Sequence, residues 1–288
     1  MRPLLSRRKP TRVLNDLREL YRYRDLIYLL VRRDLRIRYK NSALGFFWSL
    51  MNPVLQVLIM TIIVKRFFGV PIDNYSAYLF CAILPWEYFS NSVLDSCSSM
   101  LQHAPLIRKV RFPREIIPLA TVLSVTVHFL LSLCVLGIYF MVLPVHLEWK
   151  ALWILPIMFF QLLLSLGAGL LLAPINVYFE DVKFIMTALF RILFFAVPVM
   201  YPVETVGKLY NVYMLNPIAA FLTAYRKLLL PPVQVDKLQK WTGNPDLVPR
   251  GMDWHYVGIA MLMSVVIFGV GCRVFNKMKW GVAERLSY

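Results

Sequence analysis

The sequence predicts an all-α integral membrane protein with six transmembrane helices, and its composition carries most of that prediction. Hydrophobic residues make up 59% of the 288 residues, charged residues make up 17%, and the mean hydropathy is +0.59. Soluble domains are typically about 45–50% apolar and about 25% charged. The chain also carries 32 basic against 16 acidic residues. This composition excludes a disordered chain or a coiled coil, and it is too apolar for a basic nucleic-acid-binding protein.

The N-terminal arm, residues 1–42, is expected to stay in the cytoplasm. Its first 40 residues hold 13 Lys and Arg, without the apolar run that a cleavable signal peptide needs. Leu26, Leu29, Leu30 and Ile37 fall near one helical face, with arginines around them. This pattern predicts an amphipathic helix in the membrane interface. The alternative is a basic flank that only obeys the positive-inside rule.

Six segments are long and apolar enough to span a membrane, since a spanning helix needs about 20 mostly apolar residues. Two of them carry charges, Glu87 and Asp95 in the second and Arg191 in the fifth. The predicted transmembrane domain covers residues 43–274, with spans at about 43–64, 75–101, 116–143, 151–179, 184–201 and 254–272.

The distribution of basic residues orients these spans. With both termini on one side, that side holds 22 of the 32 Lys and Arg, including those of the loop at 102–115, and the opposite side holds 9. The richer side is expected to be cytoplasmic. The 202–253 segment is then the largest part outside the cytoplasm, and residues 275–288 form a cytoplasmic tail.

Motifs for catalysis are absent from the sequence. It has no G-x-x-x-x-G-K-[ST] loop for ATP and no H-E-x-x-H, and its four histidines lack metal-ligand spacing. We therefore predict no catalytic residues and no metal site. The balance shifts from catalysis toward transport.

Two further segments carry information. Residues 103–118 mix four basic residues with Leu106, Ile107, Val110 and Phe112. Those apolar side chains would face the cytosol unless something covered them, which favours a short helix docked in a partner's groove over one resting on lipid headgroups. In the 197–229 segment, Asn216-Pro217 marks a turn, followed by a short helix on the outer surface or one dipping back into the membrane.

These segments, in this order, resemble the permease subunit of type-2 ATP-binding-cassette exporters, most of all the branch that exports polysaccharides such as O-antigen, capsule and teichoic acid. The missing ATP-binding loop fits this resemblance, because a separate subunit hydrolyses ATP in that family. The resembling stretches, which span nearly the whole chain, are RRDLRIRYKNSALGFFWSLMNP (32–53), ILPWEYFSNSV (83–93), LIRKVRFPREIIPL (106–119), NVYFEDVKFI (176–185), VPVMYP (197–202) and LNPIAAFLTAYRKLL (215–229).

The resemblance implies roles by position. The helix at 24–40 would flank the ATPase, the 103–116 segment would be the coupling helix, and the 216–230 region would form periplasmic gate helices. The residues expected to couple to the ATPase are Leu106, Ile107, Arg108, Lys109, Val110, Arg111 and Phe112, with Glu180 and Asp181 as a smaller contact. The expected gate residues are Tyr201, Asn216, Pro217, Tyr225 and Arg226.

The resemblance also implies partners and a location. Two copies of the chain would form a homodimer in the bacterial inner (plasma) membrane, and each would recruit one P-loop ATPase subunit that binds ATP and Mg. This chain itself would carry no cofactor. The alternatives are a type-2 exporter of another lipid-linked or amphipathic substrate, such as a drug or a glycolipid, a membrane enzyme acting on polyprenyl-linked sugars, and a membrane scaffold without transport.

A lipid-linked glycan makes particular chemical demands on the chain. Sugar CH faces stack on aromatic rings, and a carboxylate could face a water-filled path; the candidate path residues are Phe46, Phe47, Trp48, Trp86, Glu87, Tyr88 and Phe89. Arginine binds pyrophosphate through paired hydrogen bonds. Candidates for pyrophosphate, or for anionic lipid headgroups, are Arg36, Arg38 and Lys40.

Asp95 and Arg191 are a candidate charge pair inside the membrane. Each lies 6 or 7 residues from the expected cytoplasmic end of its span. At about 1.5 Å per residue, both are expected about 10 Å deep. A charge in lipid is costly, so each should pair or face water. We therefore predict that the two side chains lie close together, within one subunit or between two.

Overall fold

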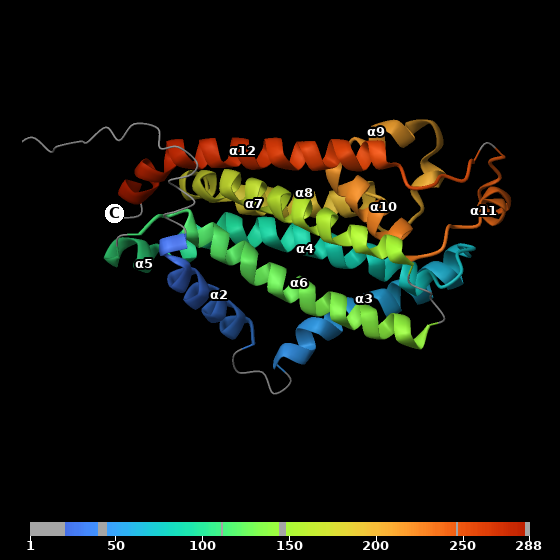
Figure 1. The fold of residues 1–288 in the computed structure, drawn as a ribbon, viewed down its shortest axis with the longest axis horizontal. Coiled ribbons are helices and arrows are strands. Elements are labelled where there is room, and N and C mark those ends of the chain that lie inside the picture. Colours follow the sequence, from blue (N-terminus) through green and yellow to red (C-terminus); the bar gives the residue numbers. More distant parts are fainter. Residues whose placement is uncertain (1–20, 40–44, 111, 144–147, 246, 286–288) are drawn as a thin grey trace, which may run out of the picture.

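The computed structural model describes residues 21–39, 45–110, 112–143, 148–245 and 247–285, and the regular structure of these residues is helical throughout. The long helices lie side by side in a bundle (Figure 1). The helices are α2 (Arg24–Tyr39), α3 (Gly45–Ile63), the π-helix η1 (Val64–Phe68), α4 (Tyr75–Gln102), α5 (Ala104–Lys109), α6 (Ile116–Val142), η2 (Trp149–Trp153), α7 (Ile154–Tyr178), α8 (Asp181–Ala196), η3 (Val203–Leu209), α9 (Tyr210–Met214), α10 (Pro217–Leu229), α11 (Val235–Thr242) and α12 (Trp254–Arg285).

The bundle has two distinct ends. The helices α2 and α5 and the C-terminal part of α12 gather at one end, and α11 lies at the other (Figure 1). Contacts support this arrangement, since the Arg285 guanidinium lies 5.4 Å from the ring centre of Tyr178, the last residue of α7. We call these the α5 end and the α11 end.

Four helical segments are long and apolar enough to cross a membrane: Met51–Phe68, Ile116–Val142, Trp149–Tyr178 and Trp254–Lys279. They coincide with four of the six predicted spans. The last one differs at its end, because α12 continues without a break to Arg285. The helix thus extends beyond residue 272, where the predicted span ends, and residues 275–285 of the expected tail are helical.

The other two predicted spans are helices of a different kind. The helix α8 has 16 residues, fewer than the about 20 that a straight crossing needs. The helix α4 has 28 residues but carries many serines. Ser90, Ser98 and Ser99 bond back to carbonyls of their own helix, Ser99 Oγ donating to the Ser96 carbonyl at 2.7 Å. These bonds satisfy the hydroxyls without water.

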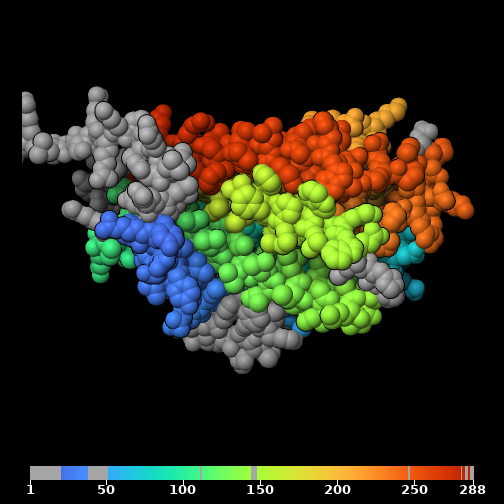
Figure 2. Space-filling model, in the orientation of Figure 1, coloured from blue at the N-terminus to red at the C-terminus, as the bar shows by residue number. Residues whose placement is uncertain are grey.

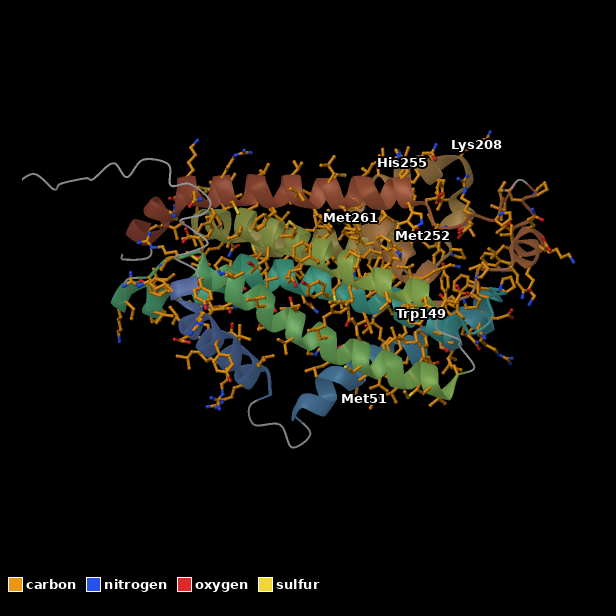
Figure 3. All side chains as sticks on the ribbon, in the orientation of Figure 1. Met51, Trp149, Lys208, Met252, His255 and Met261 are labelled. Atoms are coloured by element: carbon orange, nitrogen blue, oxygen red, sulfur yellow. The ribbon has the colours of Figure 1, made fainter. Side chains whose placement is uncertain are left out.

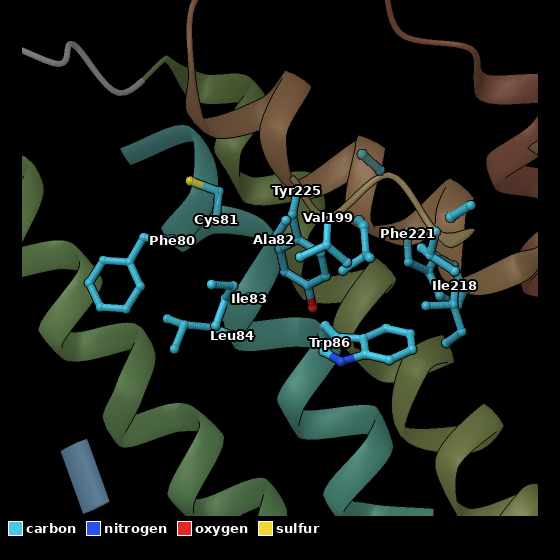
Figure 4. Packing of buried hydrophobic residues seen from close by; sticks show 14 of the residues in the cluster. Phe80, Cys81, Ala82, Ile83, Leu84, Trp86, Val199, Ile218, Phe221 and Tyr225 are labelled. Carbon is cyan, nitrogen blue, oxygen red and sulfur yellow. The ribbon is translucent and has the colours of Figure 1, made fainter. Parts of the chain in front are cut away.

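The helix α4 forms the centre of the core, which explains its lower hydropathy. It packs against α3, α6, α7, α8 and α10, and most of its residues are buried. Figure 4 shows side chains of α4, from Phe80 to Trp86, gathered with Val199 and with Phe221 and Tyr225 of α10. A helix enclosed by other helices does not need an apolar surface toward lipid.

Two glycines let α7 and α12 approach each other closely. A Cβ atom on Gly271 would lie 2.2 Å from the carbonyl oxygen of Gly167, and one on Gly167 would lie 2.6 Å from the backbone of Phe268. Any larger residue would therefore collide with backbone. Small residues at such crossings are typical of helices that pack within membranes.

The helix α2 lies on the surface of the bundle and packs against α6 (Figure 2). Leu30 is buried with Ile116 and Ala120, and Leu26 is partly buried there. Leu29 and Ile37 are 58% and 60% exposed. Only part of the predicted apolar face therefore packs against α6, while Leu29 and Ile37 stay exposed, and the interfacial role of the helix stays a prediction.

Candidate functional site

The predicted coupling segment forms a short helix, α5, that follows α4 directly at the α5 end. Its apolar residues are divided. Leu106, Ile107 and Phe112 pack partly against the chain's own core clusters. Val110 is 49% exposed, and the neighbouring Lys109 is exposed. The outward surface of this segment is thus smaller and more basic than the sequence suggested, because the chain itself covers most of the apolar side chains.

A buried histidine joins α5 to α2. His103, the residue before α5, is 5% exposed. Its Nδ1 lies 2.7 Å from the Ser99 carbonyl, and its Nε2 contacts the Arg33 guanidinium. Arginine can only donate, so Nε2 accepts and Nδ1 carries the proton. Burial lowers the pKa of His103 below its ordinary value, although Asp34, 3.8 Å away, acts in the opposite direction.

The loop after α5 is bound to the last turns of α12. Lys279 Nζ lies 2.6 Å from a carboxylate oxygen of Glu115, and Arg114 donates to the Lys279 carbonyl. Both side chains of the ion pair are about one quarter exposed, at 23% and 25%. The coupling segment is therefore held between α2 on one side and α12 on the other.

The second predicted coupling contact, Glu180 and Asp181, lies in the exposed turn between α7 and α8. Asp181 begins α8, where a negative charge interacts favourably with the helix dipole. The side-chain oxygen of Asn176 accepts from the Lys183 backbone at 3.0 Å and closes the turn. This turn lies at the α5 end, because α7 ends there.

Arg226, a predicted gate residue, is the most highly bonded side chain toward the α11 end. It is 4% exposed and lies 3.8 Å from the centre of the Tyr78 ring. Its guanidinium donates to the carbonyls of Tyr78, Pro198, Val199 and Tyr201, at 3.0 Å for Tyr78 and 2.5 Å for Pro198. A single cation thus joins α10, α4 and the segment after α8.

The remaining gate residues surround this arginine or begin its helix. Asn216 caps α10 by accepting from the Ile218 backbone at 3.0 Å, and Pro217 occupies the first turn. Tyr201 donates to the Ala196 carbonyl at 2.9 Å. Tyr225 is fully buried. The helix α10 packs against α4, α7 and α12, so it lies inside the bundle rather than on its outer surface.

Three of the candidate path aromatics pack within the subunit. Trp86 is 5% exposed, and its ring centre lies 6.1 Å from that of Phe190. Tyr88 is 2% exposed and stacks on Phe129 at 4.6 Å. Phe89 also meets Phe190, edge to face at 5.7 Å. In the single chain these rings are core residues, and a role in a path stays a prediction.

Several predicted residues lie outside the described part of the chain. These are Lys40 and Arg111, together with the side chains of Arg38, Phe46, Phe47 and Trp48. Arg36 is exposed on α2. Asp95 is partly buried on α4, and Arg191 is exposed on α8, which packs against α4. The proposed proximity of Asp95 and Arg191 stays a prediction.

Sequence reasoning identified Glu87 but missed the polar residues that it meets across helices. Glu87 lines a cavity of about 20 Å³ between α4 and α6, together with Asn91, His128 and Ser132. Arg33 and His103 are 70 residues apart and share no motif. A polar residue inside an otherwise apolar run can be recognised in the sequence. The sequence does not show which residue of another helix lies next to it.

Comparison with known proteins identifies relatives along most of the chain. The family model described as ABC-2 type transporter matches residues 25–230. The chain is 27% identical over 264 residues to the O-antigen export system permease protein RfbA of Klebsiella pneumoniae, covering 91% of this chain and 95% of that protein. It is 34% identical over 214 residues to the RfbA protein of Myxococcus xanthus, covering 73% and 82%. It is also 26% identical over 248 residues to the polysialic acid transport protein KpsM of Escherichia coli, covering 82% and 87%.

Proposed function

The chain belongs to the ABC-2 type transporter family as a permease subunit of polysaccharide export, and we propose that its cargo is a lipid-linked glycan such as O-antigen. One observation carries this proposal. The similarity to an O-antigen export permease covers nearly the full length of both chains, 91% and 95%. The lipid linkage of the cargo goes beyond what the names of the relatives say. It suits a protein whose long apolar helices would lie in a bilayer, where the lipid part of the cargo would also lie.

The proposed topology has six crossings with the α5 end in the cytoplasm. The 22 basic residues counted on that side of the sequence favour this orientation. In this topology α4 and α8 are the two crossings beyond the four apolar ones. Both would be acceptable in a membrane because α4 is enclosed by other helices, and because a short helix crosses when the bilayer thins locally.

Coupling to a separate P-loop ATPase would take place at the α5 end. The chain's ATPase partner would bind ATP and Mg, and each of two copies of the chain would recruit one partner. The exposed surface around Lys109 and Val110 would dock in a groove of the ATPase, with Glu180 and Asp181 as a smaller contact. The buried contacts of Leu106 and Ile107 would hold that surface rigidly on the bundle.

The α11 end would carry the outward gate. The bonds of Arg226 fix α10 to α4, so movement of α4 would be passed directly to the gate segment. ATP binding would close the partner ATPases and shift the population of permease arrangements through α5. Glu87 and the aromatic rings of α4 would line the glycan path after a rearrangement that opens the core around α4, and Arg36 would contact the pyrophosphate or lipid headgroups.

Loss of the gene in its own host tests the proposed cargo. Polyprenyl-linked glycan should accumulate on the cytoplasmic side, and the corresponding surface polysaccharide should disappear. A plasmid copy of the wild-type gene should restore both. Surface polysaccharide that persists unchanged, with no accumulated lipid-linked glycan, would contradict the proposal. Accumulation of a different lipid-linked species would identify one of the alternative cargoes instead.

A further inference from the structure

A cavity lies at the α11 end of the bundle, beside the segment that follows α10. Its volume is about 360 Å³, within the range of about 300–1,000 Å³ found for small-molecule sites. Its walls come from η2, the α10 helix, the segment after α10 and the residues just before α12. Met252, which lines it, lies in the half of the bundle toward α11 (Figure 3).

The charges around this cavity are mainly positive. Lys150, Lys227 and Arg250 line it, with Glu204 as an acidic neighbour. Glu204 is buried and pairs with Lys227 at 3.3 Å, so its charge is already balanced. Lys150 lies 2.8 Å from Glu148, but both side chains are more than 65% exposed, and such surface pairs are weak and exchangeable. Arg250 stacks on the ring of Tyr210 at 3.8 Å.

The wall of the cavity also contains a buried hydroxyl without a hydrogen-bond partner. Thr223 lines the cavity and is 5% exposed, and its Oγ1 has no partner among the described residues. A buried hydroxyl left without a partner is unfavourable, and a ligand that accepts its hydrogen bond removes that cost. This orphan hydroxyl therefore points to a ligand with an oxygen acceptor, independently of the charges.

An aromatic pair and two helix N-termini complete the site. Trp153 and Trp254 meet edge to face with ring centres 4.8 Å apart, and they are 51% and 44% exposed. Half-exposed tryptophans at the ends of apolar helices are typical of the level of lipid headgroups. Trp254 begins α12 and Trp153 immediately precedes α7. Both helices therefore direct their N-terminal partial positive charge to this region.

We propose that this cavity binds the phosphate group of a membrane lipid. Phosphate suits the site because it offers several acceptor oxygens, whereas the site offers lysine, arginine and hydroxyl donors. The tryptophan pair would contact the glycerol or the first chain carbons, and the lipid tail would remain in the bilayer. The phosphate could come from a phospholipid or from a polyprenyl phosphate. Both lipids offer the same phosphate oxygens to the lysine, arginine and hydroxyl donors of the site.

Binding to the full chain in detergent micelles tests the proposal by calorimetric titration. The probes are dihexanoyl phosphatidic acid and farnesyl phosphate, each with its uncharged analogue, dihexanoylglycerol and farnesol, and inorganic phosphate. At least one phosphate-bearing lipid should bind about tenfold more tightly than its uncharged analogue. The double variant Lys150→Gln/Arg250→Gln should lose about tenfold in affinity, and Thr223→Val should lose about threefold.

The charge-matched control is Lys208→Gln/Lys240→Gln, which removes two exposed cations from the same end of the bundle outside the cavity wall. This variant should bind as the wild type does. Tighter binding of phosphatidic acid would assign a phospholipid site, and tighter binding of farnesyl phosphate a polyprenyl site. Equal binding of charged and uncharged lipids, equal losses in the control, or inorganic phosphate binding as tightly as the lipids would overturn the proposal. The assay uses neither ATPase nor glycan, so its failure would leave the proposed export function standing.

Discussion

The guanidinium of Arg33 in α2 donates a hydrogen bond to Nε2 of His103, the residue that precedes α5. The two helices connected by this bond are the proposed interfacial helix and the proposed coupling helix. His103 also donates from Nδ1 to the Ser99 carbonyl of α4 at 2.7 Å. One neutral imidazole therefore links the proposed ATPase-docking segment to both the arm and the central helix.

Acidification should weaken this link. Burial lowers the pKa of His103 below its ordinary value of 6.5, so the unfolded chain binds the proton more readily than the folded chain does. The contribution to stability is present above about pH 6.5 and is lost as the pH falls through the lowered pKa. The melting temperature of the wild type in detergent should therefore fall between about pH 7.5 and pH 5.5. His103→Gln should show a smaller fall, and an identical fall would refute the assignment.

Arg226 should be required for the fold at the α11 end. Replacing it by Met removes the donor to four carbonyls, and each buried acceptor left without a partner costs about 1–3 kcal/mol. Arg226→Met should lower the melting temperature strongly, and Arg226→Lys should do so too, because an ammonium lacks the planar set of donors. The control is Arg66→Lys at an exposed position. Comparable melting temperatures for all three variants would contradict the role of Arg226.

The crossing of α7 and α12 should tolerate no side chain at Gly271. A Cβ there would lie 2.2 Å from the Gly167 carbonyl oxygen, whereas a Cβ on Gly269, two residues away in the same helix, meets nothing within 4 Å. Gly271→Val should destabilise the protein by more than about 1–3 kcal/mol, the usual cost of overpacking. Gly269→Val introduces the same residue into open space. Thermal unfolding of the two variants checks this, and equal effects would show that the helices do not cross there.

Asp95 and Arg191 are predicted to compensate each other. Asp95→Ala should reduce export, because it would leave a positive charge unbalanced in the membrane. The double variant with Arg191→Gln should regain much of the lost export. Surface polysaccharide, measured in cells lacking the native gene, gives the readout. Additive losses in the double variant would show that the two residues act separately.

The sequence predicted the helices of this protein better than it predicted their surroundings. Apolar runs located the four long apolar segments, and α2 and α5 appeared where the basic, amphipathic patterns placed them. The helix α12 continues past the predicted span because Arg273 and Lys277, which interrupt the apolar run, are good helix formers. Composition shows where a chain leaves an apolar region, but a helix can continue beyond that point.

Tertiary contacts set the limits of prediction at the candidate site. The sequence indicated that Leu106, Ile107 and Phe112 need a cover, but it did not show that the chain itself supplies most of it. Arg226 was predicted at the gate, yet its partners lie up to 148 residues away in the chain. No local pattern encodes such pairings. They depend on how α4, α10 and the segment after α8 pack together.

ATP-driven translocation of a lipid-linked glycan into proteoliposomes is the most direct test of the central claim. The chain would be reconstituted with its cognate ATPase, once as wild type and once as Lys109→Glu/Val110→Glu, whose side chains are exposed beside α5. We expect ATP-dependent glycan translocation by the wild type and at least about a tenfold loss in the variant. Lys277→Glu, an exposed charge reversal on α12, should retain activity. Wild-type translocation rates in the double variant, or no translocation by the wild type with its ATPase, would contradict it.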